Sequence, residues 1–251
     1  MDKNQLAAIQ KETDLRLIIP FGLTLRLGDV ISVGKDATFS LEGTARSVLG
    51  QPVGAPRKKG APVSTYWSSG NDVSCEFRAA GTASMLFPGL PLAEAKIDVT
   101  FGGARSWLLA MTGRRLTTLD ELNAYRKPIL AAYDAGVWKP DWALVTGLAE
   151  SDRMTLLASE AANTKIGLTL GSELSPAAGL EAKLTAGVSI AAASEQIVQC
   201  ITDHAAPVAC RALRVREHWW SGPTVGSLAS LEGADTASDT RFWESMDEGV
   251  L

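Results

Sequence analysis

Alternation of apolar and polar residues is the feature that most constrains what this chain can fold into. In the stretch KIGLTLG, residues 165–171, the apolar side chains of Ile166, Leu168 and Leu170 occupy every second position. The stretch KLTAGVSI, residues 183–190, alternates in the same way. Successive side chains of a β-strand point to opposite faces, so this pattern predicts strands with one buried face and one wet face. Such strands, joined by short turns, are typical of antiparallel sheets.

Similar patterns recur along most of the chain. Strands are expected within 15–43 and over 73–79, 83–87, 95–101, 106–111, 141–150, 153–161 and 208–217. The pair Gly102-Gly103 is interpreted as a hairpin turn, and residues 50–64, rich in proline and glycine, as a loop. We therefore expect an α+β fold: a twisted, mainly antiparallel β-sheet with a few packed helices.

One helix is expected over residues 118–134. Thr118 followed by Glu121 matches the capping box, in which the two side chains satisfy free amides of the first turn. Apolar residues then recur at spacings near 3.6 until a glycine ends the pattern. Pro128 lies inside this stretch and is expected to kink or split the helix. A shorter helix is expected over residues 2–12.

Acidic residues gather at the C-terminal end of the chain. The net charge is −4 overall, yet residues 217–251 hold seven acidic residues and one arginine, so residues 1–216 carry a slight excess of positive charge. This division predicts a body, 1–216, and an acidic C-terminal tail, 217–251. Two interpretations stay open: a solvated tail, or a tail that covers a basic surface until something removes it.

Within this tail, residues 221–241 are rich in Gly, Ser, Ala and Thr and show no periodicity. That composition predicts a flexible linker. The chain then regains the apolar residues Phe242, Trp243 and Met246. We expect these residues to dock on another surface, because exposed tryptophan in a free tail is unusual.

The residue inventory argues against catalysis, metal binding and nucleic-acid binding. His204 and His218 are the only histidines, no G-x-S-x-G motif occurs, and the cluster Cys200, His204 and Cys210 lacks the paired spacing of a zinc site. We interpret that cluster as two strands joined by a turn, with the two thiols near each other across it. We expect no catalytic residue, metal or cofactor, and the near balance of charge does not favour nucleic acid as a partner. Carboxylates that meet only in the fold keep an enzyme open as an alternative.

No stretch of the sequence predicts a membrane-spanning helix or a signal peptide. Spanning helices need about 18 or more consecutive apolar residues, and the chain has no such run. Its first residues are polar and include Asp2, Glu12 and Asp14. The three cysteines form no paired framework, so we expect the cytoplasm as the location.

The order of these elements between residues 95 and 216 resembles the pore-forming domain of gasdermins, especially the short bacterial members and their fungal relatives. The resemblance rests on the strand AKIDVTF, then SWLLAM, then the helix LDELNAYRKPILAAYDAG. The strands of DWALVTGLAESDRMTLLASEAANTKIGLTLG follow, and the late strand VACRALRVRE precedes a short tail. Bacterial members usually carry a lipidated cysteine within their first residues, and residues 1–15 here hold none.

The resemblance implies an autoinhibited cell-death or defence effector, antiviral in its setting. A short C-terminal segment would hold the protein inactive in the cytoplasm. After release by a protease or by a partner chain, the body would form a homo-oligomer on the inner membrane leaflet and permeabilise it through a β-barrel pore. The stretches expected to insert are 68–112 and 147–190, which are rich in Ala, Gly, Ser and Thr.

Three sets of residues follow from this reading. Basic residues expected to attract anionic lipids are Arg16, Arg26, Arg57, Lys58 and Lys59. Inhibitory contacts of the tail are expected from Phe242, Trp243 and Met246. The expected cleavage linker contains Ser221, Gly222, Leu228, Leu231, Asp235, Asp239 and Arg241.

A second interpretation, from another class of protein, is a soluble α+β binding or scaffold protein. In that case the tail would dock on a partner subunit, and the protein would be a stable oligomer with no affinity for lipid. Removal of the tail separates the two readings, because only the first expects membrane leakage from the truncated chain.

Overall fold

The structure is a computed structural model that describes residues 3–70, 73–77, 97–170, 181–185, 188–192, 197–202, 205–218 and 222–227. Within these residues every strand pairing is antiparallel, and helices pack beside the strands. The expected α+β fold, a mainly antiparallel sheet with a few packed helices, is confirmed. The helices are α1 (Lys3–Thr13), α2 (Ala45–Leu49) and α3 (Asn123–Asp134).

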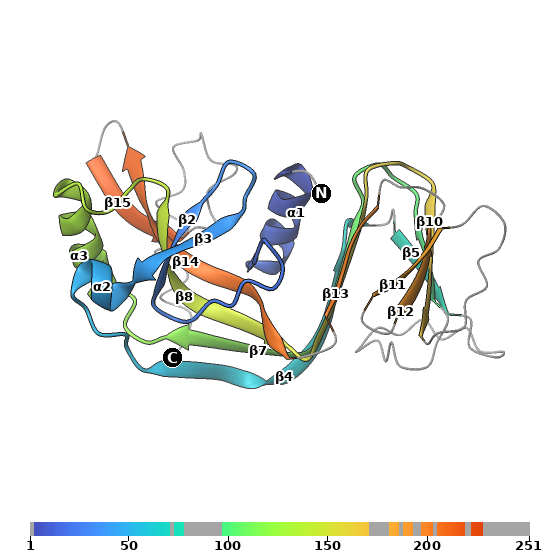
Figure 1. Cartoon of the computed structure of the whole chain (residues 1–251), viewed down its shortest axis with the longest axis horizontal. Helices are drawn as coiled ribbons and strands as arrows, with labels where there is room; N and C mark the ends of the chain where they lie inside the picture. Colours follow the sequence, from blue (N-terminus) through green and yellow to red (C-terminus); the bar gives the residue numbers. More distant parts are fainter. Residues whose placement is uncertain are drawn as a thin grey trace.

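The strands divide into two sheets (Figure 1). The larger, the body sheet, holds β1 (Arg16–Leu17), β2 (Asp29–Val33), β3 (Phe39–Thr44), β4 (Pro56–Ser68), β7 (Trp107–Leu119), β8 (Trp142–Ser151), β9 (Arg153–Ser159), β13 (Ile197–Thr202), β14 (Ala206–His218) and β15 (Gly222–Ser227). The smaller, the distal sheet, lies at the opposite end of the molecule from α2 and α3. It holds β5 (Val73–Phe77), β6 (Ile97–Phe101), β10 (Thr164–Leu170), β11 (Glu181–Thr185) and β12 (Val188–Ala192).

Long, nearly continuous strands form the centre of the body sheet. Only Asp152 separates β8 from β9, and β7 pairs with both of them. Along the other edge of β8 and β9 run β14 and β13, with Ala206 opposite Ser151 and Thr202 opposite Met154. Strands β13 and β14 therefore run one after the other along the edge of β9 and β8, and they do not pair with each other as a hairpin.

This arrangement corrects the expected hairpin around the cysteines. Cys200 lies opposite Leu156 and Cys210 opposite Leu148, so eight positions along β8 and β9 separate their partners. At about 3.3 Å per residue eight positions span up to roughly 26 Å of strand. A disulfide needs Cα atoms within about 7 Å, so this geometry does not allow one.

The Cys210 thiol is buried, and burial raises its pKa to about 12 from an ordinary value of 9.0. The unfolded chain would lose this proton above pH 9, while the folded chain keeps it until about pH 12. Stability from this group is therefore present below pH 9 and is lost from there upward, by about 1.4 kcal/mol per pH unit. We expect Cys210→Ala to flatten this slope, as urea unfolding at pH 8 to 11 would measure; equal slopes in both proteins would contradict the assignment.

The main helix begins later than its sequence suggests. Thr118 belongs to β7, where it lies opposite Arg57 of β4 and Gly147 of β8, so its backbone is held in the sheet instead of capping a helix. Helix α3 starts at Asn123 and has no side-chain cap. It runs without a break through Pro128 to Asp134, so the expected capping box and the expected split are both wrong.

Two further expectations fail because of tertiary pairing. Residues 56–64 of the expected loop 50–64 belong to strand β4, which pairs with β7 from Leu119 to Leu108. Register shifts after Lys59 and at Val63 accommodate the glycine and proline between them. Gly102-Gly103 is not a hairpin turn, because β6 and β7 belong to different sheets. The sequence reading also missed α2, although Thr44 and Ser47 form a complete capping box at its start.

The beginning of the expected linker is a strand. β15 pairs with β14 from His218 opposite Gly222 to Leu213 opposite Ser227. The buried side chain of Val225 packs into a core cluster with Tyr125 and Ile129 of α3. The expected flexible linker is therefore wrong over 222–227, and β14 (Ala206–His218) runs across the boundary drawn at residue 217. Residues 228–251 lie outside the described residues.

Apolar side chains on both faces of the body sheet hold the helices. One cluster, between α1 and the sheet, includes Ile9, Trp107, Leu109 and Leu156. Another lies at the other end against α2 and α3, where Trp138 is fully buried and meets Trp142 edge to face at 5.8 Å between ring centroids. The body therefore has a packed core of its own at each end.

Candidate functional site

The same four chain segments lie side by side twice, in the same order. In the body sheet β4 pairs with β7, β7 with β9, and β9 with β13. In the distal sheet β5 pairs with β6, β6 with β10, and β10 with β12. Each distal strand adjoins its body counterpart in sequence, as β4 leads into β5 and β6 into β7. The distal sheet is thus the continuation of the body ribbon, folded back at one line (Figure 1).

The register of the central pair is consistent on both sides of this fold line. Leu109 lies opposite Leu156 and Trp107 opposite Ala158 in the body sheet. Beyond the fold line, Phe101 lies opposite Thr164 and Val99 opposite Ile166. The stretches expected to insert, 68–112 and 147–190, are therefore neighbours in both sheets.

Each described crossing of the fold line contains one residue in the left-handed backbone region. These are Gly70 with φ 78°, Arg105 with φ 60° and Asn163 with φ 57°. An extended strand requires negative φ, so these three residues produce the bend. For a residue with a Cβ atom the left-handed region costs about 1 kcal/mol or more. Arg105 and Asn163 therefore carry strain that a straight strand would not have.

Hydroxyl groups form bonds within each central crossing, and one backbone bond joins the two crossings. Ser159, which is fully buried, donates from Oγ to Thr164 Oγ1 at 2.8 Å, and Thr164 Oγ1 donates to the Ala161 carbonyl at 3.0 Å. Ser106 Oγ donates to the Gly103 carbonyl at 2.9 Å. The backbone amide of Ser159 donates to the Ser106 carbonyl at 2.9 Å. These bonds satisfy polar groups that burial at the bend would otherwise leave unpaired.

The distal sheet has two chemically different faces at its centre. Val99, Phe101 and Ile166 are fully buried and point to one side. On the other side Thr100 is half-buried and its partner Lys165 is exposed. The alternation that predicted these strands thus corresponds to one apolar face and one wet face.

A second bend lies inside the body sheet, where Asp152 separates β8 from β9. Gly113 faces it on β7 with φ 62°, and its amide donates to Ser64 Oγ at 3.2 Å. Arg115 Nη1 donates to Asp152 Oδ1 at 2.6 Å, and this contact raises the pKa of the guanidinium. Burial, together with the nearby Arg211 charge, lowers the pKa of Arg114, which precedes Arg115 on β7.

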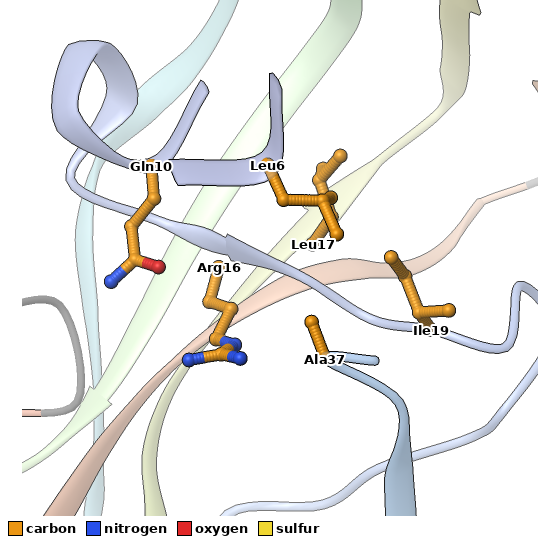
Figure 2. Close-up of a pocket in the computed structure, with 6 residues that line it drawn as sticks. All are labelled: Leu6, Gln10, Arg16, Leu17, Ile19 and Ala37. Carbon is orange, nitrogen blue, oxygen red and sulfur yellow. The ribbon is translucent and has the colours of Figure 1, made fainter. Parts of the chain in front are cut away.

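Helix α1 lies beside the fold line. The Gln5 side chain donates from Nε2 to the Ser159 carbonyl at 3.2 Å. Between α1 and β1, Leu6, Gln10 and Arg16 line a small cavity, with the Arg16 guanidinium directed away from the helix (Figure 2). Its volume of about 10 Å³ holds no more than a water molecule, so we assign it no ligand.

The predicted lipid-attracting residues lie on separate elements. Arg57 and Lys58 are exposed on β4, and Arg26 is exposed before β2. Arg16 on β1 is half-buried, with its guanidinium carbon 5.5 Å from the centre of the Phe39 ring. Arg57 also lines a cleft of about 240 Å³ with Thr118 and Arg211, but Asp120 and Glu121 line the same cleft, so its charge is mixed.

Other predicted site residues are not described. The side chain of Lys59 is one of them. The remaining ones are Phe242, Trp243, Met246, Ser221, Leu228, Leu231, Asp235, Asp239 and Arg241, all outside the described residues. Of the residues named for the expected cleavage linker only Gly222 is described, in β15.

The fold line was not predicted from the sequence. The stretch EAANT, residues 160–164, interrupts two alternating runs and was the available signal. It marks a break between strands, but the partner strands on each side decide that the break leads into a different sheet. Gln5 and Gly113 had no sequence signal at all.

Two other kinds of feature are absent from the residues that the structure describes. None of the helices in this part of the chain is long and apolar enough to cross a membrane. Across the same residues, His, Cys, Asp and Glu side chains form no group of three that could hold a metal ion.

Comparison with solved structures finds a bacterial gasdermin from Bradyrhizobium tropiciagri. The match covers 89% of this chain and 90% of that chain, with 12% sequence identity and a TM-score of 0.35. No protein-family model and no curated protein matches this sequence. A TM-score this low does not establish function, so the strand order described above is the stronger observation.

Proposed function

We propose that this chain is an autoinhibited pore-forming protein that permeabilises membranes after its C-terminal segment is released. One observation carries the proposal: a ribbon of four antiparallel segments is folded back on itself, with the same neighbours on both sides of the fold line. Straightening the ribbon would join β4 to β5, β6 to β7, β9 to β10 and β12 to β13 without exchanging a single strand neighbour. Two long hairpins would result.

The dimensions and faces of such hairpins suit a membrane. Residues 97–119 and 153–170 would each form one strand longer than the roughly 9–11 residues that a tilted transmembrane strand needs. Val99, Phe101 and Ile166 would face lipid, with Thr100 and Lys165 on the water side. Pairing between neighbouring copies would satisfy the outer edges of the ribbon, as a closed barrel in lipid requires.

Attraction to the membrane is proposed to come from exposed basic residues. Arg57 and Lys58 on the outermost strand of the body ribbon, together with Arg26, are accessible to anionic headgroups. Each such residue contributes about 1 kcal/mol near an anionic surface. Arg16 is less suited, because it is half-buried against Phe39.

The proposed inhibitory segment starts after β15. Val225 is packed in the core with α3, and β15 covers the outer edge of β14. Removing this strand would expose apolar surface and an unpaired edge. We therefore place the activating release C-terminal to Ser227, within the remainder of the expected linker, and regard cell death or antiviral defence as the setting.

A chain truncated after Ser227 is expected to release dye from anionic lipid vesicles, while the full chain leaves the same vesicles intact. The truncation removes the acidic tail but keeps β15 on the body. A chain truncated after Arg216 is the matched control, because it also loses β15 and Val225. We expect it to melt at a lower temperature than the first truncation.

Two outcomes of this experiment would count against the proposal. If the chain that ends at Ser227 folds, as circular dichroism reports, and yet neither binds nor permeabilises anionic vesicles, the protein does not act on membranes. If the full chain is also a stable oligomer in solution with no affinity for lipid, the binding or scaffold interpretation takes its place.

A further inference from the structure

Helix α1 packs on the body sheet through a face that is unusually polar for a buried surface. Gln5, Gln10 and Thr13 are at least nine-tenths buried on this face, and Ile9 is its only fully buried apolar side chain among the described residues of the helix. Thr13 Oγ1 donates back to the Ile9 carbonyl within the helix at 2.7 Å. Polar contacts contribute less to stability than apolar burial of the same area. Leu6 and Ala8 add half-buried apolar contacts to the core cluster, so α1 is held by a mixed face in which polar side chains fill three of the four buried positions.

The contact of Gln5 is placed at the centre of the fold line. Ser159, whose carbonyl accepts from Gln5 Nε2, is the last residue of β9. Its backbone amide donates to the carbonyl of Ser106, which precedes β7. Its hydroxyl donates to Thr164 Oγ1 at the start of β10. Through Ser159, α1 is therefore connected to both central crossings.

At the fold line, backbone strain opposes the bend and polar contacts stabilise it. Arg105 and Asn163 hold left-handed backbone conformations that a straight strand would relieve. The hydroxyl network and the Gln5 contact are made in this bent arrangement. The bend is thus strained in its backbone and held by a small number of buried polar contacts.

We propose that α1 is a latch, which through Gln5 keeps the ribbon folded back at the fold line against the strain of Arg105 and Asn163. Release of α1 from the sheet then loosens both central crossings together. This inference rests on the proposed function only where it names the straight ribbon as the active form. The latch itself can be measured in the full chain without a membrane.

Hydrogen exchange of the full chain tests the latch. Gln5→Leu keeps the size of the side chain but deprives the Ser159 carbonyl of its donor. We expect amides of residues 102–106 and 160–166 to exchange about five to ten times faster, while those of β15, which packs beside α3, stay unchanged. Asn4→Leu, the same kind of change at the neighbouring exposed position of α1, is the matched control and is expected to leave all these rates unchanged.

A faster exchange confined to α1, or spread equally over the whole chain, would overturn the proposal. A second variant keeps it testable if Gln5→Leu does not fold. Asn163→Gly removes the strain of the left-handed backbone, and we expect it to slow exchange at 160–166 about threefold in the otherwise unchanged chain. Unchanged or faster exchange in this variant would equally overturn the latch. Vesicle leakage is not needed for either result, so a failure of the pore-forming proposal remains separate.

Discussion

Replacing Trp107 by alanine is expected to lower the free energy of unfolding by about 4 kcal/mol. The Trp107 side chain is 1% exposed and belongs to the core cluster that includes Ile9 of α1 and Leu156 of β9. Its backbone amide also donates to Ser69 Oγ at 3.1 Å, at the crossing from β4. The substitution therefore leaves a large cavity between the helix and the sheet, beside the fold line.

Urea unfolding followed by circular dichroism measures this loss. Trp107→Phe keeps an aromatic ring in the same space and is expected to lose much less. Val137→Ala, at an apolar side chain that is 52% exposed, is expected to change stability by less than about 0.5 kcal/mol. A Trp107→Ala protein as stable as the Val137→Ala protein would show that this cluster does not hold α1 on the sheet.

Gly113→Val is expected to destabilise the protein by about 3 kcal/mol. With φ 62° the backbone at Gly113 is unfavourable for a β-branched residue, and a Cβ atom there would lie 2.0 Å from Asp152 Oδ2. The carboxylate would have to move, and with it the contact to Arg115 Nη1. The substitution therefore combines backbone strain with the loss of the polar contacts at the bend between β8 and β9.

Gly136→Val is the matched control for this prediction. Gly136 has φ 71°, but no atom lies within 4 Å of the position that its Cβ would occupy. Gly136→Val therefore introduces backbone strain alone. Thermal unfolding is expected to show that it lowers the free energy of unfolding by roughly half as much as Gly113→Val. Equal losses at the two positions would mean that the packing of Asp152 against Gly113 is unimportant.

Local patterns in the sequence were sufficient for several strands whose two faces differ. They failed for residues 183–190, expected as one alternating strand, because β11 ends at Thr185 and pairs with β12, which begins at Val188. The alternation around Ile166 predicted strand β10, and the structure places Ile166 in the core and Lys165 at the surface. Residues 3–13 likewise form the short helix expected over 2–12. Such predictions succeed because the period of side-chain directions depends only on the local backbone.

Predictions that depended on a distant partner were less successful. Thr118 has the sequence of a helix start, yet β4 and β8 on either side keep it in a strand. Residues 56–68 contain glycine and prolines and still pair along β7. Cys200 and Cys210 flank a turn-like segment, yet the strands that hold them run on along the same neighbours.

By itself, the sequence determined that this chain would form alternating strands with one apolar face, a few helices and an acidic C-terminal end. Only the tertiary structure decided which strands are neighbours, and with that the folding back of one four-segment ribbon into two sheets. The physical reason is that strand pairing is made by backbone hydrogen bonds, which every residue except proline can form equally well with any partner. The choice among partners is made by packing across the whole molecule, including the contact of α1 at the fold line.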